Sequence, residues 1–288
     1  MKIRKVVIPA AGYGTRFLPA TKAQPKEMLP IVDKPIIQYV VEEAVASGIE
    51  DVIIVTGWQK RSIEDHFDYP YELEKHLEAQ GKTEQLSEVR RIANLANFIY
   101  IRQKGPYGNA TPVLCSKHLI GNEPFAVLWG DDFIYSEPPR LKQMVDVFNK
   151  YQSIVLSVIE TNDPEDTKRY GFIKGKKLEN CVYEVEDFLE KPGPENAPSN
   201  LAAVSGYILT PEIFQILERL KPGKDEEFWL VDAIKEFMKT NKVYACKIEN
   251  GKYYDTGNKL EYLKANIDFA LKRPDYNKEL REYLKKIN

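Results

Sequence analysis

The chain has 288 residues, of which 43% are hydrophobic and 29% charged, and 41 Lys and Arg against 43 Asp and Glu give a formal net charge of −2. This length and apolar content can support a sizeable core and exclude disorder as the main state. The balanced charge argues against a nucleic-acid partner, because binding to a phosphate backbone requires a basic domain. No apolar run approaches the length of a membrane span, so we expect no membrane partner either.

The three cysteines, Cys115, Cys181 and Cys246, lie far apart and form no CxxC or zinc-binding pattern. Scattered thiols in odd number are typical of a reducing compartment. The apolar stretch at the N-terminus is too short for the core of a signal peptide. We therefore expect a cytoplasmic protein of the α/β class.

The first elements along the chain predict a parallel sheet. Residues 5–9 and 51–56 are short apolar runs typical of buried strands. Between them, apolar residues along 36–45 share one helical face, and Pro35 and Gly48 are placed to open and end that helix. Strand, helix and strand at this spacing predict a right-handed βαβ unit.

The middle of the chain carries a helical excursion and two more strands. The polar, charge-alternating stretch 71–93 predicts exposed helix, and 98–102 and 125–129 predict strands. A helix is expected near 111–119, with Thr111 as its N-cap.

Beyond residue 150 the pattern is less regular. Strands are predicted at 153–159, 170–174, 182–189, 203–209 and 243–248, and helices at 211–220, 228–240 and 258–272. The basic stretch that begins at residue 272 is typical of a solvated surface helix.

The most informative segment follows the first strand and reads Ala11-Gly12-Tyr13-Gly14-Thr15-Arg16. A glycine-rich turn at the carboxyl end of a parallel strand lets backbone N–H groups approach a phosphate or a base edge. The dinucleotide-binding pattern is not met, because Phe17 stands where the third glycine is needed and no acidic residue follows Thr56-Gly57. No P-loop pattern occurs in the sequence.

Three cations follow this turn in one proline-stiffened loop. Arg16, Lys22 and Lys26 all lie within fifteen residues of Gly12. Arg offers a planar fork for paired phosphate oxygens and Lys a compact charge. We interpret the loop as a cradle for a triphosphate rather than as scattered surface lysines.

Several segments resemble the sugar-1-phosphate nucleotidyltransferases. The resemblance begins with Gly12-x-Gly14-Thr15-Arg16, continues with Pro25-Lys26-Glu27-Met28-Leu29-Pro30 and Asp33-Lys34-Pro35, and covers nearly the whole chain. Stretches 26–30 and 198–201 are typical of the bacterial-type UTP–glucose-1-phosphate uridylyltransferases in that family. Further matching segments are Arg102-Gln103, Gly130-Asp131, Tyr170-Gly171, Glu190-Lys191-Pro192, Pro198-Ser199-Asn200-Leu201, Val231-Asp232-Ala233-Ile234 and Asp255-x-Gly257-Asn258.

The resemblance implies a Rossmann-like α/β fold, with a mixed, mostly parallel sheet flanked by helices and small β-rich additions that bind a sugar. It implies one domain over 1–272, with a nucleotide-binding part at about 1–150 and a sugar-binding part at about 151–257. Residues 273–288 are expected to form a helical tail. A homodimer or homotetramer is expected.

Two aspartates are the candidate metal ligands. Asp131 follows the predicted strand 125–129, at the edge where an open α/β sheet places its ligand crevice. Mg²⁺ takes oxygen ligands, often one or two carboxylates with substrate phosphates and waters. The resemblance implies that Asp131 and Asp255 bind Mg²⁺ as the cofactor, whereas Asp132 is expected in a turn or a supporting position.

The resemblance also assigns the phosphate and nucleotide contacts. Arg16 and Lys26 are implied to hold the β- and γ-phosphates and, with Asp131 and Lys191, to form the catalytic set. The uracil is implied to meet the backbone of the glycine loop. The implied nucleotide-binding residues are Ala11, Gly12, Gly14, Thr15, Glu27, Gln103 and Gly108.

The sugar contacts are implied to come from the second half. Glu190 is implied to bind the sugar hydroxyls and Lys191 the sugar phosphate. Gly171 is implied to let the sugar pack against the backbone, and Asn200 to add a polar contact.

Two segments depart from the family's pattern. The run Lys104-Gly105-Pro106-Tyr107-Gly108-Asn109-Ala110-Thr111-Pro112 replaces a glycine- and leucine-rich run that ends in Gly-His-Ala. It neighbours the base and ribose, so the choice of UTP over dTTP depends on it. Glu226-Glu227-Phe228-Trp229-Leu230 replaces the usual Glu-Ile-Gln-Leu-Thr and is expected to reshape the sugar pocket or a subunit contact.

The implied substrates are UTP and glucose 1-phosphate, and the implied products are UDP-glucose and pyrophosphate. The resemblance implies that a sugar-phosphate oxygen attacks the α-phosphorus in line. No general base is needed, since the second pKa of a phosphate group, about 6, leaves this nucleophile largely ionised at neutral pH. The sequence agrees, because no Ser/His/Asp arrangement is present. His66, His76 and His118 are expected to be structural or exposed.

The sequence leaves two alternatives open. One is a thymidylyltransferase, or a nucleotidyltransferase for another hexose 1-phosphate, which shares the same loop and aspartates. The other is a catalytically silent sugar-nucleotide sensor. The retained Arg16, Lys26, Asp131, Lys191 and Asp255 argue against a sensor, because a binding-only protein has no need of them.

Overall fold

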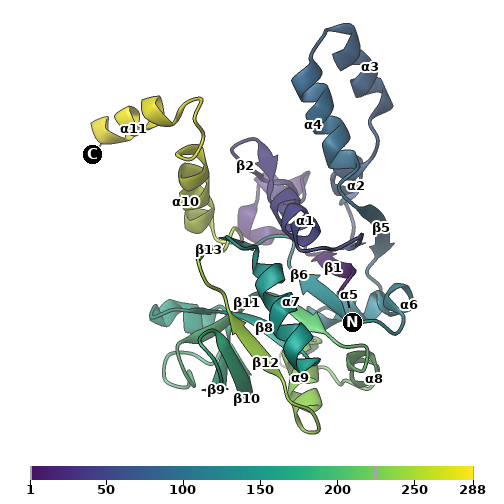
Figure 1. Cartoon of the computed structure of the whole chain (residues 1–288), viewed down its shortest axis with the longest axis vertical. Helices are drawn as coiled ribbons and strands as arrows, with labels where there is room; N and C mark the ends of the chain where they lie inside the picture. The colour runs from purple at the N-terminus through teal and green to yellow at the C-terminus, as the bar shows by residue number, and fades with distance from the viewer. Residues whose placement is uncertain (1, 224–225, 288) are drawn as a thin grey trace.

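A mixed nine-stranded sheet forms the centre of the molecule (Figure 1). The computed structural model describes residues 2–223 and 226–287. In spatial order the strands are β5 (Asn97–Arg102), β4 (Asp51–Thr56), β1 (Lys5–Ala10), β6 (Phe125–Leu128), β11 (Leu201–Leu209), β8 (Val155–Glu160), β12 (Tyr244–Lys247), β10 (Val182–Glu190) and β9 (Gly171–Lys177).

The N-terminal half of the sheet is parallel. Strands β5, β4, β1 and β6 all pair in parallel, and β1 and β4 are in register from Lys5↔Asp51 to Ala10↔Thr56. Helix α1 (Ile36–Ala46) connects β1 to β4 and buries its apolar face. It ends before Gly48, which has a φ of 96° that suits glycine. The predicted βαβ unit is confirmed.

Strand β11 joins the two halves of the sheet. It runs antiparallel to both β6 and β8, and all nine of its residues are buried. Its pairing with β8 shifts between Ala203 and Tyr207, around Ser205 with a φ of 66°. The nucleotide-binding and sugar-binding parts expected from the sequence therefore share one continuous sheet.

Helices cover both faces of the sheet. Alternate residues of β1 enter different cores, Val6 and Ile8 with α1 and α7 (Arg140–Tyr151), and Val7 with α5, α8 and α9. The last three helices are α5 (Ala110–Cys115), α8 (Ile213–Leu217) and α9 (Leu230–Met238).

Several element predictions need correction. Helices α8 and α9 are shorter than the predicted ranges 211–220 and 228–240. Thr111 is not an N-cap: it is buried inside α5, where its hydroxyl donates to the carbonyl of Pro106 at 2.7 Å. Some elements were not predicted from the sequence. They are α7, α2 (Arg61–Phe67), α6 (Lys117–Ile120) as a separate helix, and the two-stranded sheet of β7 (Phe133–Ser136) and β13 (Gly251–Tyr254).

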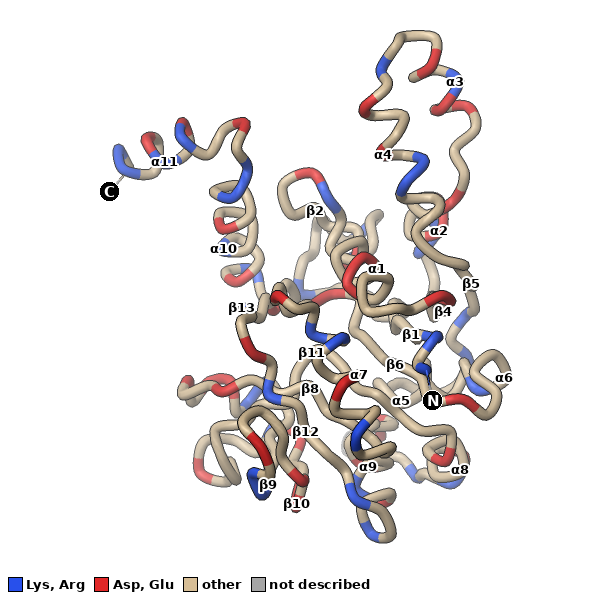
Figure 2. Tube along the Cα trace, in the orientation of Figure 1, with Lys and Arg blue, Asp and Glu red and all other residues tan. Residues whose placement is uncertain are grey.

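Two helical projections leave the body of the molecule (Figure 1). The predicted excursion 71–93 is the pair α3 (Tyr71–Ala79) and α4 (Thr83–Ala93). The other projection is α10 (Lys259–Ala270), which Asn258 caps, followed by α11 (Asn277–Lys286), which has no buried residue. Figure 2 shows acidic and basic residues interspersed along these helices. None of the helices in the described part of the chain has the length and apolar character needed to cross a bilayer.

Candidate active site

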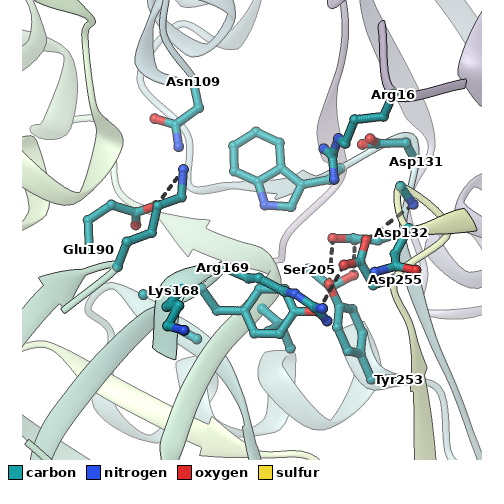
Figure 3. A pocket seen from close by; sticks show the side chains of 18 of the residues that line it. Arg16, Asn109, Asp131, Asp132, Lys168, Arg169, Glu190, Ser205, Tyr253 and Asp255 are labelled. Atoms are coloured by element: carbon teal, nitrogen blue, oxygen red, sulfur yellow. Dashed lines mark hydrogen bonds and ion pairs between the residues drawn. The ribbon is translucent and has the colours of Figure 1, made fainter. Parts of the chain in front are cut away.

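A cavity of about 910 Å³ opens at the carboxyl ends of β1 and β6 and reaches across β11 to the ends of β9 and β10. Asn109 and Glu190 lie at one end, and Arg16, Asp131, Asp132 and Asp255 at the other (Figure 3). The lining carries six cations: Arg16, Lys26, Lys168, Arg169, Lys191 and Lys259. It carries four carboxylates: Asp131, Asp132, Asp255 and Glu190. The cavity is therefore formally positive in a chain that is formally negative, which suits an anionic ligand.

Lys26 and Asp131 form an ion pair on the wall of this cavity. Burial alone would lower the pKa of the Lys26 ammonium, but the Asp131 and Glu27 carboxylates raise it above its usual value. Burial alone would raise the pKa of Asp131, but Lys26 and Arg16 lower it. Both groups are therefore charged at neutral pH.

The glycine loop is built around this lysine. A Cβ atom on Gly12 would lie 3.6 Å from the Lys26 Nζ. Gly14 has a φ of 67°, and its carbonyl accepts a hydrogen bond from the Thr21 hydroxyl at 2.6 Å. The turn predicted from the sequence thus places its backbone directly over the Lys26 ammonium.

Asp255 is oriented by two hydrogen bonds. The Tyr170 hydroxyl donates to its Oδ2 at 2.9 Å, and the Gly257 amide donates to its Oδ1 at 3.1 Å. A Cβ atom on Gly257 would lie 3.0 Å from the Arg16 guanidinium, so this glycine lets Arg16 pack against the turn. Residues from opposite ends of the sequence thereby meet at one wall.

Asp132 lies beside Asp131 and holds β11 and β13 to this wall. It accepts hydrogen bonds from the Ser205 hydroxyl and, at 3.1 Å, from the Tyr253 hydroxyl. Burial, together with the Asp131 charge, raises the pKa of Asp132 to about 7. These bonds fit the expected supporting position.

The donor set at this end fits a hard divalent cation. Asp131 and Asp255 present carboxylate oxygens to one cavity. Within the described residues, no group of three or more His, Cys, Asp and Glu could hold a metal ion without other ligands. A magnesium ion here would need substrate phosphates and waters to complete its coordination, as Mg²⁺ commonly does.

At the other end, Glu190 and Lys191 terminate β10. Burial raises the pKa of the Glu190 carboxyl. Lys191 has a φ of 45°, and its amide donates to the Tyr170 carbonyl at 3.1 Å. Its Nζ lies 3.9 Å from the Glu190 Oε1 and 4.9 Å from the centre of the Trp229 ring.

Gly171 lies on the cavity wall, but it is also required by packing. A Cβ atom there would come within 2.6 Å of the Phe188 ring and 3.2 Å of the Glu190 carboxylate. Glycine at this position therefore lets Phe188 and Glu190 reach their observed places.

Other expected contacts lie outside the large cavity. Gly12 and Thr15 line a separate hollow of about 310 Å³ beside Trp58 and Lys60. Ala11 and Gln103 lie next to the carboxyl ends of β1 and β5.

Three more of the expected ligand contacts, Glu27, Gly108 and Asn200, are not among the residues that line the large cavity. Glu27 is fully buried and forms an ion pair with Lys60 at 2.8 Å. Gly108, with a φ of 131°, packs its backbone against Phe228, where a Cβ would overlap the carbonyl. Asn200 is exposed in the turn before β11, away from the cavity lining.

Sequence reasoning missed several lining residues. Lys168, Arg169 and Lys259 lie in polar stretches where surface lysines and arginines are common, so no local signal marks them. Tyr170 lies in the matching segment Tyr170-Gly171, which was the one available indication of its role. Asn109 and Trp229 lie in the two segments that depart from the family's pattern.

Comparisons with known proteins agree with this geometry. The model of the nucleotidyl transferase family matches residues 5–271. The UTP–glucose-1-phosphate uridylyltransferase YngB of Bacillus subtilis (strain 168) is 52% identical over 286 residues, which are 99% of this chain and 96% of that protein.

Solved structures extend the similarity to the fold. A UTP-bound UGPase from Acinetobacter baumannii superposes with a TM-score of 0.91 at 37% identity over all of both chains. A UDP-glucose pyrophosphorylase complexed with UDP-glucose superposes with a TM-score of 0.86 at 46% identity, covering 94% of this chain and all of the other.

Proposed function

We propose that this chain, which belongs to the nucleotidyl transferase family, transfers a uridylyl group from UTP to glucose 1-phosphate and releases UDP-glucose and pyrophosphate. The observation that carries the proposal is the single cavity with cations and aspartates at one end and Glu190 with Lys191 at the other. Relatives at half identity or more bear the uridylyltransferase name, which favours UTP over dTTP.

The reaction needs positioning and charge compensation rather than a protein nucleophile. The sugar phosphate is itself the nucleophile and is largely ionised at neutral pH. Lys191 binds and orients this phosphate, and Glu190 accepts hydrogen bonds from the hexose hydroxyls. Holding both substrates in one cavity turns their encounter into an intramolecular step.

Arg16 and Lys26 hold the phosphates of UTP and compensate the charge that develops on the departing pyrophosphate. Lys26 can do so because it is charged and partly exposed on the cavity wall. The backbone of Ala11, Gly12, Gly14 and Thr15 approaches the nucleotide, and Gln103 completes the base pocket.

Asp131 and Asp255 would hold Mg²⁺ when the nucleotide is bound. The ion supplies Lewis-acid polarisation and charge neutralisation at the phosphates. Tyr170 and Gly257 orient Asp255 for this role through the hydrogen bonds described above.

We also place the enzyme in the cytoplasm and expect a homodimer or homotetramer. The three cysteines are all free thiols, as a reducing compartment requires. Light scattering of the purified protein tests the oligomeric state.

Pyrophosphate release with Mg²⁺ and glucose 1-phosphate tests the function, with UTP, dTTP, CTP, ATP and GTP assayed in parallel. A strong preference for UTP is expected, and removal of Mg²⁺ with EDTA is expected to abolish turnover. A preference for dTTP would move the chain to the thymidylyltransferases. Binding of UDP-glucose without turnover of any nucleotide would favour the sensor.

A further inference from the structure

The two segments that depart from the family's pattern are bonded to each other. The Phe228 amide donates to the Tyr107 carbonyl at 2.9 Å, and the Ala110 amide donates to the Phe228 carbonyl at 3.0 Å. The Leu230 amide donates to the Asn109 Oδ1 at 2.7 Å. Three hydrogen bonds therefore fix residues 228–230 against the loop 107–110.

Trp229, at the centre of the bonded segment, extends to the sugar end of the cavity. Trp229, Lys191 and Glu190 all line the large cavity, and all three also line a second hollow of about 230 Å³. The Lys191 Nζ lies over the indole at 4.9 Å from its centre, within the range of a cation–π interaction.

We propose that Trp229 is a positioning residue, which holds the Lys191 ammonium toward the sugar phosphate, and that Asn109 holds Trp229 in place through the Leu230 amide. The inference rests on the proposed function, because it takes Lys191 to be the ligand of the sugar phosphate. It assigns a role to the two departures that the family pattern does not explain.

A lysine at this position needs such a support. The Lys191 side chain is 42% exposed, and a long mobile side chain loses much conformational entropy when it binds a phosphate. The nearest carboxylate is Glu190, 3.9 Å away, and a tight ion pair with it would neutralise the charge that the phosphate needs. An indole attracts the ammonium through its quadrupole and leaves that charge uncompensated.

Steady-state kinetics of Trp229 variants test the proposal. Trp229→Leu removes the aromatic face and is expected to raise the KM for glucose 1-phosphate by about 3- to 10-fold, with the KM for UTP changed less than 2-fold. Trp229→Phe keeps a weaker aromatic face and is expected to restore part of the loss. Two results would overturn the cation–π role. One is an equal effect of Trp229→Leu and Trp229→Phe, and the other is an equal rise in the KM for glucose 1-phosphate and the KM for UTP.

Asn109 variants test the second half of the proposal. Asn109→Ala removes the acceptor for the Leu230 amide and is expected to raise the KM for glucose 1-phosphate in the same way. Asn109→Asp keeps the acceptor oxygen and is expected to remain close to the wild type. If Asn109→Asp raised the KM for glucose 1-phosphate as much as Asn109→Ala, Asn109 would not act through the hydrogen bond to the Leu230 amide.

Lys235→Met is a matched control on the neighbouring helix. Lys235 lines the smaller hollow and forms an ion pair with Asp187 at 3.2 Å, outside the large cavity. Its removal changes the local charge as much as removal of Lys191 would. The KM for glucose 1-phosphate is expected to stay within 2-fold, and a larger rise would indicate a general electrostatic effect instead.

A substrate-free experiment separates this inference from the proposed function. Urea unfolding of Lys191→Met, Trp229→Leu, the double variant and the wild type gives their coupling in a double-mutant cycle. We expect the folding equilibrium constant of the double variant to differ by about 2- to 5-fold from the product of the two single fold-changes. Zero coupling would overturn the contact even if UTP is the substrate, whereas coupling without turnover would leave the contact standing and reject the function.

Discussion

Lys26 and Asp131 neutralise each other before any substrate is bound, because they form an ion pair at the cavity wall. On the proposed mechanism, a nucleotide that arrives with Mg²⁺ therefore exchanges partners with both groups. This exchange does not require a change of protonation, since the pKa of Lys26 is raised and that of Asp131 lowered by their surroundings.

Lys26→Ala and Asp131→Ala are each expected to lower kcat by about 10²–10³-fold while the fold remains intact. On the proposed mechanism, the first variant loses a charge that compensates the departing pyrophosphate, and the second loses a ligand of Mg²⁺. Turnover and circular dichroism of the purified variants check this.

Lys22→Ala is the comparison within the loop. The sequence predicts Lys22 as a third cation of the phosphate cradle, but the structure places it outside the lining of the large cavity, on the smaller hollow. Its kcat is expected to stay within about threefold of the wild type. Near-normal turnover of Lys26→Ala would remove Lys26 from the mechanism.

His66 is half-buried on α2, where its Nε2 lies 2.9 Å from the Gln38 Oε1, and burial lowers its pKa below the ordinary 6.5. The native state then takes up a proton less readily than the unfolded chain. The contribution of the neutral His66 to the free energy of unfolding is therefore complete above pH 6.5 and is lost as the pH falls below that value.

In the wild type, the free energy of unfolding is expected to fall as the pH is lowered from 7.5. In His66→Gln this fall is expected to be smaller. Urea unfolding at several pH values measures it. His118→Gln, on the exposed side of α6, is the control and is expected to retain the wild-type slope. An unchanged slope in His66→Gln would contradict the burial effect.

Some site residues could be predicted from the sequence because the local pattern alone places them at the ligand crevice. Asp131 follows directly from a strand that ends at the ligand crevice, and Gly12 and Lys26 belong to one tight loop. Glu27, next to Lys26, is fully buried and pairs with Lys60, which comes from another segment. No local pattern reveals that partner.

At the scale of elements, α7 connects the core to the cavity through one buried arginine. Arg140 is fully buried and makes a two-pronged ion pair with Glu43 of α1, at 2.8 and 2.7 Å. It also donates a hydrogen bond to the carbonyl of Ser205, which lines the cavity where the pairing of β11 with β8 shifts. Through Arg140, helices α1 and α7 therefore support the part of β11 where its pairing with β8 shifts.

Arg140→Met is expected to lower the free energy of unfolding by about 3–5 kcal/mol, because it leaves the Glu43 carboxylate buried without its counter-charge. Chemical denaturation measures the change. Lys142→Met removes an exposed pair with Asp146 from the same helix and is expected to cost no more than about 0.5 kcal/mol. Equal costs would show that the burial of Arg140 has no energetic consequence.

The parallel half of the sheet could be predicted because strand, helix and strand are consecutive and strongly patterned. Helix α7 was missed although Leu141, Met144 and Phe148 share its buried face; Arg140 breaks the apolar pattern at its start. The pairing of β7 with β13 joins residues more than one hundred positions apart, which no local pattern specifies.

At the scale of the whole molecule, α11 is a helix with little attachment to the rest. None of its described residues is buried, and it does not line the cavity. Helix α10 differs, because Phe269 packs on the rings of Tyr39, Phe133 and Tyr254.

A chain that ends at residue 276 is expected to keep its turnover and to lose no more than about 1 kcal/mol of unfolding free energy. Phe269→Ala in the full chain is the contrast and is expected to lose about 3–5 kcal/mol. Thermal melts and the pyrophosphate assay compare the two. A large loss on truncation would show that α11 packs against another surface, such as a second copy.

The place of β11 in the sheet also bears on how the chain is made. During synthesis β6 is complete at residue 128, but the neighbour that covers its edge is complete only at residue 209. At 5–20 residues per second the ribosome needs roughly 4–16 s for that interval. For that time the nascent parallel sheet exposes an unpaired apolar edge, a known route to aggregation. Synonymous codons that slow translation over residues 129–209 are therefore expected to lower the yield of folded enzyme without changing the specific activity of what is recovered.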